Sequence, residues 1–488
     1  MAESASRRRP NVVYVCSDQH SYKYTGYAGH PLVQTPNLDR IAQQGVVFTN
    51  AYCGSPVCVP ARTSLMTGMY PSDCDSFCNS TVWDGSHPAW GTHLRKAGYD
   101  CRATGKMDMN DDFDMGFVEI ETAHGHRHSP DITSLFRRPL AYRMSERPGV
   151  DGGPRENRHR DAEKTQTAVE FITREAEGLE GPWAFYVGLH QPHPSFVAFR
   201  PYYDRYPLPR IDMPDVPQGH LENLHLVYQA MRHFKRIATP IPEDRIRRAR
   251  AGYYGMITEL DEYMGQIWNA LEQTEQLEDT VFIYTSDHGE SLGEHGLWHK
   301  NNLYENAAHI PLVMAGAGMP KNRRVGVPVA HVDMVATLLD LAGSRIPSSL
   351  RGHSLLPLVE GHPGDHPGFA YTESHSEGNC TGSFMIRKGD WKYIHFTWYD
   401  DLLFNLVEDP GEFKSRIDDP EAQGVRKELW DILHSQIDPE AVTCRAFEAQ
   451  DRVLREIAEG KTEEELAGVF EGRLGPGLAR VLASRYKV

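Results

Sequence analysis

Apolar runs alternate with amphipathic stretches over most of the chain. Four runs have the length and near-continuous apolar character of buried strands: residues 11–17, 183–189, 281–286 and 306–315. Three longer stretches place apolar residues at helical spacing: residues 161–176, 243–273 and 331–342. Strands that alternate with helices in this way predict a doubly wound α/β domain, with a mostly parallel sheet flanked by helices.

Two further elements lead into the segment 53–68. Residues 35–45 predict a short helix, because they have Thr at the N-cap position, Pro at the first helical position and Gly just past the end. Residues 46–52 predict a strand that delivers the segment. Within the segment, the run 62–66 predicts the opening of another helix.

The pattern changes near residues 361–368, which are rich in Gly, Pro and His. Beyond them, short runs separated by turns predict a small antiparallel sheet: residues 384–387, 391–396 and 402–406. A helix over about 421–436 is expected to cover this sheet. We divide the chain into an α/β domain (1–365), an antiparallel C-terminal subdomain (366–438) and a helical tail (439–488). The tail carries a capping box at residues 462–465 and can pack on a neighbouring subunit, as in a homo-oligomer.

The composition is that of an acidic globular protein. The 488 residues include 51 Lys and Arg against 67 Asp and Glu, a net charge of −16. This charge argues against nucleic acid as a partner but leaves room for a local basic pocket. No apolar run approaches the ~20 residues needed to cross a bilayer, and residues 1–10 lack the apolar region of a signal peptide. We therefore expect no membrane partner and a cytoplasmic location.

One of the eight cysteines stands in a distinctive context, since Cys58 is followed by Pro60 and Arg62. Arg62 can turn back toward the thiol, and Pro60 restricts the backbone between them. The helix that opens here would present unpaired N–H groups and a positive dipole end to an anion. Such a place suits a nucleophile that attacks a tetrahedral oxyanion. The alternative is a buried structural cysteine in a tight turn.

Polar side chains also gather where predicted strands end. They are Asp18 and Gln19, His190 and His193, and Asp287 and His288, and Lys106 follows a glycine near a strand end. Open α/β sheets bind ligands at the carboxyl ends of their strands. Taken singly, these residues have ordinary alternatives as helix caps, turn residues or solvated surface charges. Their shared placement favours a ligand site.

The motifs at 58–62, 105–108 and 287–300, in this order, resemble the formylglycine-dependent type I sulfatases of the alkaline phosphatase superfamily. The resemblance covers roughly residues 10–410. It implies that a maturation enzyme oxidises Cys58 to formylglycine, whose hydrated aldehyde is the nucleophile, and that Arg62 orients this hydrate.

The resemblance also implies a cation site and a sulfate site. The cation, Ca2+ with Mg2+ or Mn2+ as alternatives, would be held by four residues: Asp18, Gln19, Asp287 and His288. The sulfate would be bound by Lys106, His193 and Lys300, with His193 as the proton donor.

Three positions depart from the usual family pattern. The common Asp-Asp pair is Asp18-Gln19, and Gln19 offers a carbonyl oxygen without a charge. His288 stands where many relatives have Asn, and it can bind the cation or hydrogen-bond the nucleophile. Asp108 stands where His is usual. That departure leaves open whether another group assists breakdown of the covalent intermediate or whether Asp108 binds a substrate hydroxyl.

The implied activity is hydrolysis of a sulfate monoester, of a sulfated carbohydrate, an aryl alcohol or choline. The alternative is a phosphonate monoester or phosphate diester hydrolase, which can share the nucleophile and an Asp-Gln metal pair. A third interpretation is a binding protein with a relic site. The loops at 123–160 and 196–241 are expected to rim the site, and Glu373 and His375 to lie where the smaller domain meets it.

Overall fold

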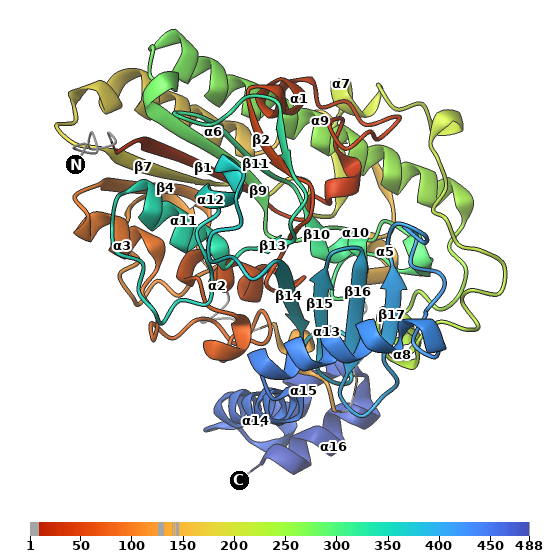
Figure 1. Ribbon diagram of the computed structural model, residues 1–488. Coiled ribbons are helices and arrows are strands. Elements are labelled where there is room, and N and C mark those ends of the chain that lie inside the picture. Colours follow the sequence, from red (N-terminus) through yellow and green to blue (C-terminus); the bar gives the residue numbers. More distant parts are fainter. Residues whose placement is uncertain (1–8, 125–130, 139, 141, 143–145, 488) are drawn as a thin grey trace.

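The computed structural model describes residues 9–124, 131–138, 140, 142 and 146–487. The N-terminal residues 1–8, on which part of the signal-peptide prediction rests, lie outside this range, as do parts of the predicted 123–160 loop. Figure 1 shows a large twisted sheet with helices on both faces, and below it a small sheet followed by the C-terminal helices.

The large sheet has eight strands in the order β12-β2-β11-β9-β1-β7-β4-β5. They are β1 (Asn11–Ser17), β2 (Gly45–Phe48), β4 (Asp100–Lys106), β5 (Val118–Ala123), β7 (Trp183–Gly188), β9 (Thr280–Ser286), β11 (Leu312–Gly316) and β12 (Arg323–Val325). Neighbouring strands pair in parallel except around β11, which runs antiparallel to both β9 and β2. The prediction of a mostly parallel sheet is confirmed.

Alternate residues of β1 face the two helical layers, as strand geometry requires. Val13 and Val15 belong to an apolar core shared with α1 (Pro36–Gln43), α6 (Asp161–Glu170) and α9 (Glu243–Gln273). Val12 and Tyr14 belong to a second core, shared with three other helices: α2 (Cys58–Thr67), α3 (Trp90–Lys96) and α11 (Asp333–Leu341). The doubly wound prediction is thus confirmed.

The predicted strand at 46–52 is wrong as one element. β2 stays in the large sheet, whereas β3 (Ala51–Tyr52) pairs with β10 (His309–Ile310) and β13 (Val329–Ala330). The chain bends at Asn50, whose side chain donates a hydrogen bond to the Gly326 carbonyl at 2.7 Å. A polar turn residue therefore redirects the chain before the Cys58 segment, which the apolar pattern did not reveal.

Two other predictions are corrected. The 306–315 stretch is not one strand, because α10 (Glu305–Ala308) and β10 come before β11. The predicted irregular segment at 196–241 contains β8 (Phe196–Phe199), α7 (Arg200–Tyr203) and α8 (Leu226–Phe234). Tyr228 and Met231 of α8 are fully buried in the core that also receives the small sheet.

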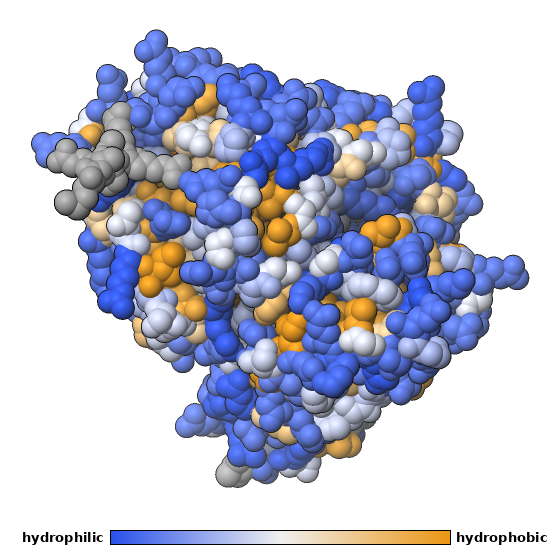
Figure 2. Space-filling model, viewed as in Figure 1, coloured by the Kyte–Doolittle hydropathy of each residue, from blue (hydrophilic) through white to orange (hydrophobic). Residues whose placement is uncertain are grey.

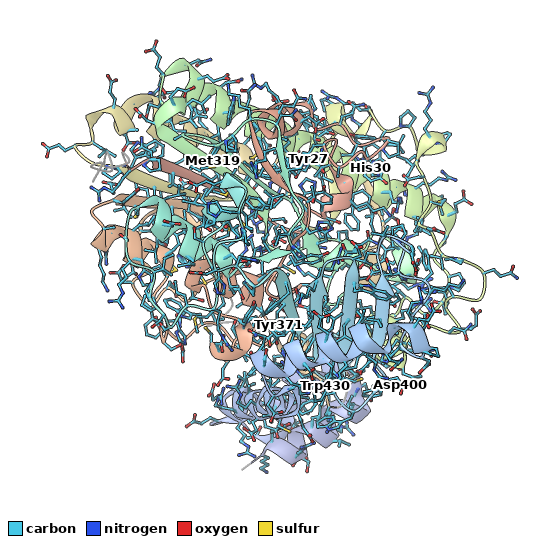
Figure 3. All side chains as sticks on the ribbon, viewed as in Figure 1. Tyr27, His30, Met319, Tyr371, Asp400 and Trp430 are labelled. Carbon is cyan, nitrogen blue, oxygen red and sulfur yellow. The ribbon has the colours of Figure 1, made fainter. Side chains whose placement is uncertain are left out.

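The small sheet is antiparallel, in the order β14 (Phe369–Ser374), β15 (Ser383–Lys388), β16 (Trp391–Phe396) and β17 (Leu402–Asn405). The sheet and its covering helix α13 (Gln423–Gln436) are confirmed, while β14 was not predicted. Tyr371 of β14 packs edge-on against Tyr70, with 4.5 Å between the ring centres (Figure 3). Trp430 of α13, in contrast to buried Tyr371, is 43% exposed.

The tail forms α14 (Pro439–Ala458), α15 (Glu463–Leu474) and α16 (Pro476–Tyr486), with the capping box of Thr462 and Glu465 in place. Apolar residues of these helices pack on residues 132–136 of the same chain. The domain boundaries and an oligomer through the tail stay predictions. Within the described ranges, no helix combines the length and apolarity that a bilayer crossing needs. Figure 2 shows apolar residues in separate patches on a largely polar face.

Two glycines let β4 and β7 approach closely just before the strands end. Gly105 lies opposite Gly188, and a Cβ at position 188 would come within 1.9 Å of the Lys106 carbonyl oxygen. Since backbone cannot yield as a flexible side chain does, this pair of glycines sets the position of Lys106.

We predict that Gly188→Ala lowers the free energy of unfolding by about 2 kcal/mol, because the added methyl group must push the Lys106 backbone away. Denaturant unfolding with an unchanged m-value would measure the loss. Gly178→Ala is the control, since a Cβ there meets no atom of the described chain within 4 Å. Equal stability of the two variants would contradict the close approach.

Candidate active site

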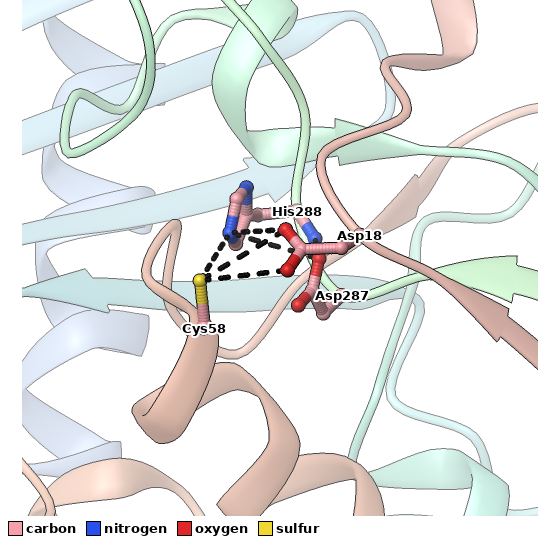
Figure 4. A group of neighbouring side chains, drawn as sticks. All are labelled: Asp18, Cys58, Asp287 and His288. Atoms are coloured by element: carbon pink, nitrogen blue, oxygen red, sulfur yellow. Dashed lines mark hydrogen bonds and ion pairs between the residues drawn. The ribbon is translucent and has the colours of Figure 1, made fainter. Parts of the chain in front are cut away.

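The predicted site residues converge at the carboxyl edge of the large sheet. Asp18 and Gln19 directly follow β1, Asp287 and His288 directly follow β9, and Lys106 ends β4. Cys58 is the first residue of α2, so this helix begins four residues earlier than predicted. Figure 4 shows Asp18, Cys58, Asp287 and His288 pointing toward one another.

The Cys58 thiol lies among charged and polar groups. Its Sγ atom is 2.8 Å from Lys300 Nζ, 3.4 Å from His288 Nε2 and 3.9 Å from each carboxylate oxygen of Asp18. His288 Nδ1 is 3.0 Å from the Gly289 carbonyl oxygen, which can only accept a hydrogen bond. Nδ1 therefore carries a hydrogen, and Nε2 is the ring nitrogen that faces Cys58.

Arg62 is fully buried and ties three elements together. Its Nε donates to Asp287 Oδ2 at 2.9 Å, and its Nη1 donates to the Lys106 carbonyl at 2.7 Å and to the Tyr186 hydroxyl at 2.9 Å. The guanidinium of α2 thus fixes the ends of β9 and β4 around position 58. Its Nη2 has no hydrogen-bond partner in the part of the chain that the structure describes.

Lys106 lies between two carboxylates. Its Nζ contacts Asp18 Oδ2 and lies 3.1 Å from Asp108 Oδ2. Burial alone would lower the pKa of Lys106, but Asp108 and Asp18 raise it well above its usual value. Burial alone would raise the pKa of Asp18, but Lys106, His193 and Lys300 hold it well below its usual value. These groups are therefore ionised at neutral pH.

The site residues differ in how much of their surface is exposed, and we call the fully buried ones the floor and the slightly exposed ones the rim. Asp18, Gln19, Asp287 and His288 have no exposed surface, so they form a sealed floor. Four residues of the rim keep a little exposed surface: Cys58 at 4%, Lys106 at 8%, Asp108 at 6% and Lys300 at 6%. An incoming molecule meets the rim, which contains both lysines.

His193 and His190 occupy different environments. His193 Nδ1 donates to the Pro194 carbonyl at 2.7 Å, and burial lowers its pKa to about 4, with Asp18 opposing this shift and the two site lysines adding to it. His193 is therefore neutral in the free site. His190 instead contacts Arg160, and its backbone N–H donates to Asp161.

The donor set at the floor suits a divalent cation. Single ligand atoms of Asp18, Cys58, Asp287 and His288 all lie within 4.8 Å of one another. The buried Oε1 of Gln19 has no hydrogen-bond partner among the described residues. Gln19 Nε2 donates to Glu290, so Oε1 is the amide atom left for another ligand. Two carboxylates and an amide oxygen are ligands that hard cations prefer.

Sequence reasoning missed the residues that hold this floor. Buried Glu290 accepts hydrogen bonds from Gln19 Nε2 and from the backbone N–H groups of Leu292 and His299. Burial opposes its ionisation, but these and the His299 side chain lower its pKa to about 2. His331 Nε2 binds the Ser286 carbonyl at 2.9 Å. Only their position after buried strands or in polar loops could have suggested them.

Glu373 and His375 do not join the Cys58 group. They are buried and lie 3.5 Å apart, and Glu373 accepts hydrogen bonds from the Ser72 N–H and the Tyr371 hydroxyl. The pair lies where the smaller domain packs on the large one, and a place beside the substrate cleft stays a prediction. A later residue of the same segment, Asn379, donates to the carbonyl of Asn301, next to Lys300.

Comparisons with known proteins agree with this geometry. The family model described as Sulfatase matches residues 10–344, and the model for the C-terminal part of N-sulphoglucosamine sulphohydrolase matches residues 293–438. The chain is 31% identical over 430 residues to arylsulfatase K of Canis lupus familiaris, covering 83% of this chain and 78% of that protein.

Solved structures share the fold. The phosphonate monoester hydrolase of Agrobacterium radiobacter has 26% identity and a TM-score of 0.72, covering 88% of this chain and 95% of that chain. A protein solved with its substrate D-glucosamine-2-N,6-O-disulfate has 20% identity and a TM-score of 0.71, covering 88% of this chain and 97% of that chain. With the family model over most of its α/β domain and a close match to arylsulfatase K along most of both chains, the protein belongs to the sulfatase family and is a sulfate ester hydrolase.

Proposed function

We propose that this sulfatase hydrolyses the sulfate monoester of a carbohydrate by way of a formylglycine formed at Cys58. The observation that carries the proposal is the place of Cys58, whose thiol contacts Lys300 and lies 3.9 Å from Asp18 at the start of a buried helix. The carbohydrate part is in keeping with the sulfated glucosamine bound by a protein of the same fold. Formylglycine, once hydrated, supplies a hydroxyl nucleophile and a second hydroxyl for release of sulfate.

Asp18, Gln19, Asp287 and His288 would hold the divalent cation, with Ca2+ favoured by the oxygen ligands. The bound cation would supply positive charge that favours an ionised nucleophile and offsets charge on a sulfate oxygen. Lys106 and Lys300, which belong to the slightly exposed rim, would bind the other sulfate oxygens. Arg62 would keep Asp287 and Lys106 in register with position 58.

His193 would protonate the leaving alcohol. The ring is neutral in the free site, and the negative charge of a bound ester favours its protonated form. The Pro194 carbonyl fixes Nδ1, so Nε2 is the atom that would pass the proton on. This role couples proton uptake by His193 to substrate binding.

The second candidate is hydrolysis of a phosphonate monoester or phosphate diester. It is favoured by the Asp18-Gln19 pair and by the 26% identity to a phosphonate monoester hydrolase. We predict a higher kcat/KM for an aryl sulfate than for an aryl phosphonate monoester with the same leaving group. The reverse order would favour the second candidate.

We predict that Cys58→Ser stops after one sulfuryl transfer, because serine lacks the second hydroxyl that releases sulfate. Intact-mass spectrometry after incubation with an aryl sulfate should show the addition of one SO3 group, and Cys58→Ala should show none. The solvent-exposed Cys444→Ser is the control and should keep full turnover. Sustained multiple turnover by Cys58→Ser would overturn the proposed nucleophile.

We also predict that removal of the cation with a chelator lowers thermal stability and that Ca2+ restores it, because a ligand that binds only the folded state stabilises it. At a Ca2+ concentration of 100 Kd the gain should be about 2.7 kcal/mol.

Gln19→Leu should weaken Ca2+ binding by about tenfold or more, since it removes an amide oxygen ligand. Titration calorimetry would measure this, with exposed Gln43→Leu as the control. Unchanged affinity in Gln19→Leu would exclude Gln19 as a ligand.

A further inference from the structure

Asp108 forms part of the accessible wall beside Lys106. It follows β4 by two residues with a left-handed backbone, at φ 52°, and its N–H donates to the Ala123 carbonyl at 3.2 Å. Its Oδ2 lies 3.1 Å from Lys106 Nζ and 3.9 Å from Arg62 Nε. The side chain is 9% exposed, against 8% for Lys106, so both keep a little contact with solvent.

Asp108 adds a negative charge to a site that binds an anion. The group around Cys58 contains three carboxylates, Asp18, Asp108 and Asp287, and three basic side chains, Arg62, Lys106 and Lys300, beside His288. Asp18 and Asp287 belong to the cation-binding floor, whereas Asp108 does not. Burial would raise the pKa of Asp108, but Lys106 and Arg62 lower it, so the carboxylate stays ionised. Its charge is therefore not accounted for by cation binding.

This charge acts differently on esters of similar shape. A sulfate monoester carries one negative charge, whereas a phosphate monoester carries two above neutral pH. Lys106 would hold either ester within a few ångströms of Asp108, and in a largely buried site that separation makes charge repulsion substantial. A bound cation attracts the dianion more strongly than the monoanion, but it does so with and without the Asp108 charge, so the change on removing that charge isolates the effect of Asp108.

We propose that Asp108 is a specificity-determining residue that makes the site select monoanionic esters over dianionic ones. The inference rests on the proposed function, because it places the ester's anionic group on Lys106. Asp108 would act by its charge, whereas a residue that only binds a substrate hydroxyl would not separate esters by charge.

The test is Asp108→Asn, which removes the charge and keeps the shape. Asn tolerates a positive φ and can still accept a hydrogen bond from Lys106. Asp111→Asn is the matched control, since it removes the same charge from an exposed position three residues further along the chain. Thermal unfolding would confirm that both variants are folded.

Binding of two small anions of the same shape gives a readout that does not need turnover. Methanesulfonate carries one negative charge, and methylphosphonate carries two at pH 9. We expect Asp108→Asn to improve the affinity for methylphosphonate relative to methanesulfonate by on the order of tenfold or more, with no change in Asp111→Asn. An unchanged affinity ratio in Asp108→Asn would overturn the inference.

Turnover gives the second readout and separates charge from the identity of the central atom. The probes are 4-nitrophenyl sulfate, 4-nitrophenyl phosphate and methyl 4-nitrophenyl phosphate, of which only the second is a dianion. Asp108→Asn should raise kcat/KM for the dianion relative to both monoanions by on the order of tenfold. If Asp108→Asn instead changes kcat/KM for both phosphate esters equally relative to the sulfate ester, charge selection is refuted.

The two proposals fail in distinguishable ways. If the wild-type enzyme hydrolyses the aryl sulfate but the ratios do not move, only the role of Asp108 falls. If the wild-type enzyme neither hydrolyses the aryl sulfate nor binds methanesulfonate, the proposed function and this inference fall together.

Discussion

The site depends on a buried ion pair between Arg62 on the helix that begins at Cys58 and Asp287 at the end of the central strand β9. Both side chains have no exposed surface, and burying a charge costs several kcal/mol unless a partner compensates it. The guanidinium also binds the carbonyl of Lys106 and the hydroxyl of Tyr186. This one guanidinium therefore sets the mutual positions of the helix that begins at Cys58, the carboxylate of Asp287 and the backbone of Lys106.

The rest of the fold serves this arrangement. The parallel strands β1, β9, β7 and β4 bring their ends to one edge, and the Gly105–Gly188 contact draws the last two together. Glu290 holds the amide of Gln19 by its nitrogen, which leaves the oxygen free for a cation. Asp18, Gln19, Asp287 and His288 are fully buried, whereas Lys106 and Lys300 keep a little exposed surface, so the proposed cation and the proposed ester would occupy different places.

The spacing of apolar residues predicted much of the fold, because a long segment with a regular apolar period strongly favours one type of secondary structure. The helix expected at 243–273 occurs as α9, and the strands β1, β7 and β9 lie within one residue of their predicted bounds. The break at Asn50, the strand β14 and the helix α8 were missed, since each depends on contacts distant in sequence. Asn50 reaches Gly326, for example, across 276 positions.

For the site, position after a buried strand was the signal for Asp18, Gln19 and Asp287, and the family motif was the signal for Lys106; the structure brings these residues together. Glu373 and His375 were expected only at the meeting of the two domains, where they form a buried pair that packs β14 on the large domain. The sequence could not reveal that Arg62 binds Asp287, since this depends on the crossing of separate elements, or that Asp108 turns toward Lys106, which its left-handed backbone allows.

Asp18, Gln19 and Asp287 are proposed to hold one divalent cation beside residue 58. Anomalous diffraction from crystals soaked in Mn2+ tests this site most directly. We expect a single strong peak within about 2.0–2.6 Å of oxygens from Asp18, Gln19 and Asp287. A peak elsewhere, or no peak at this group in a folded and Mn2+-saturated crystal, would contradict it.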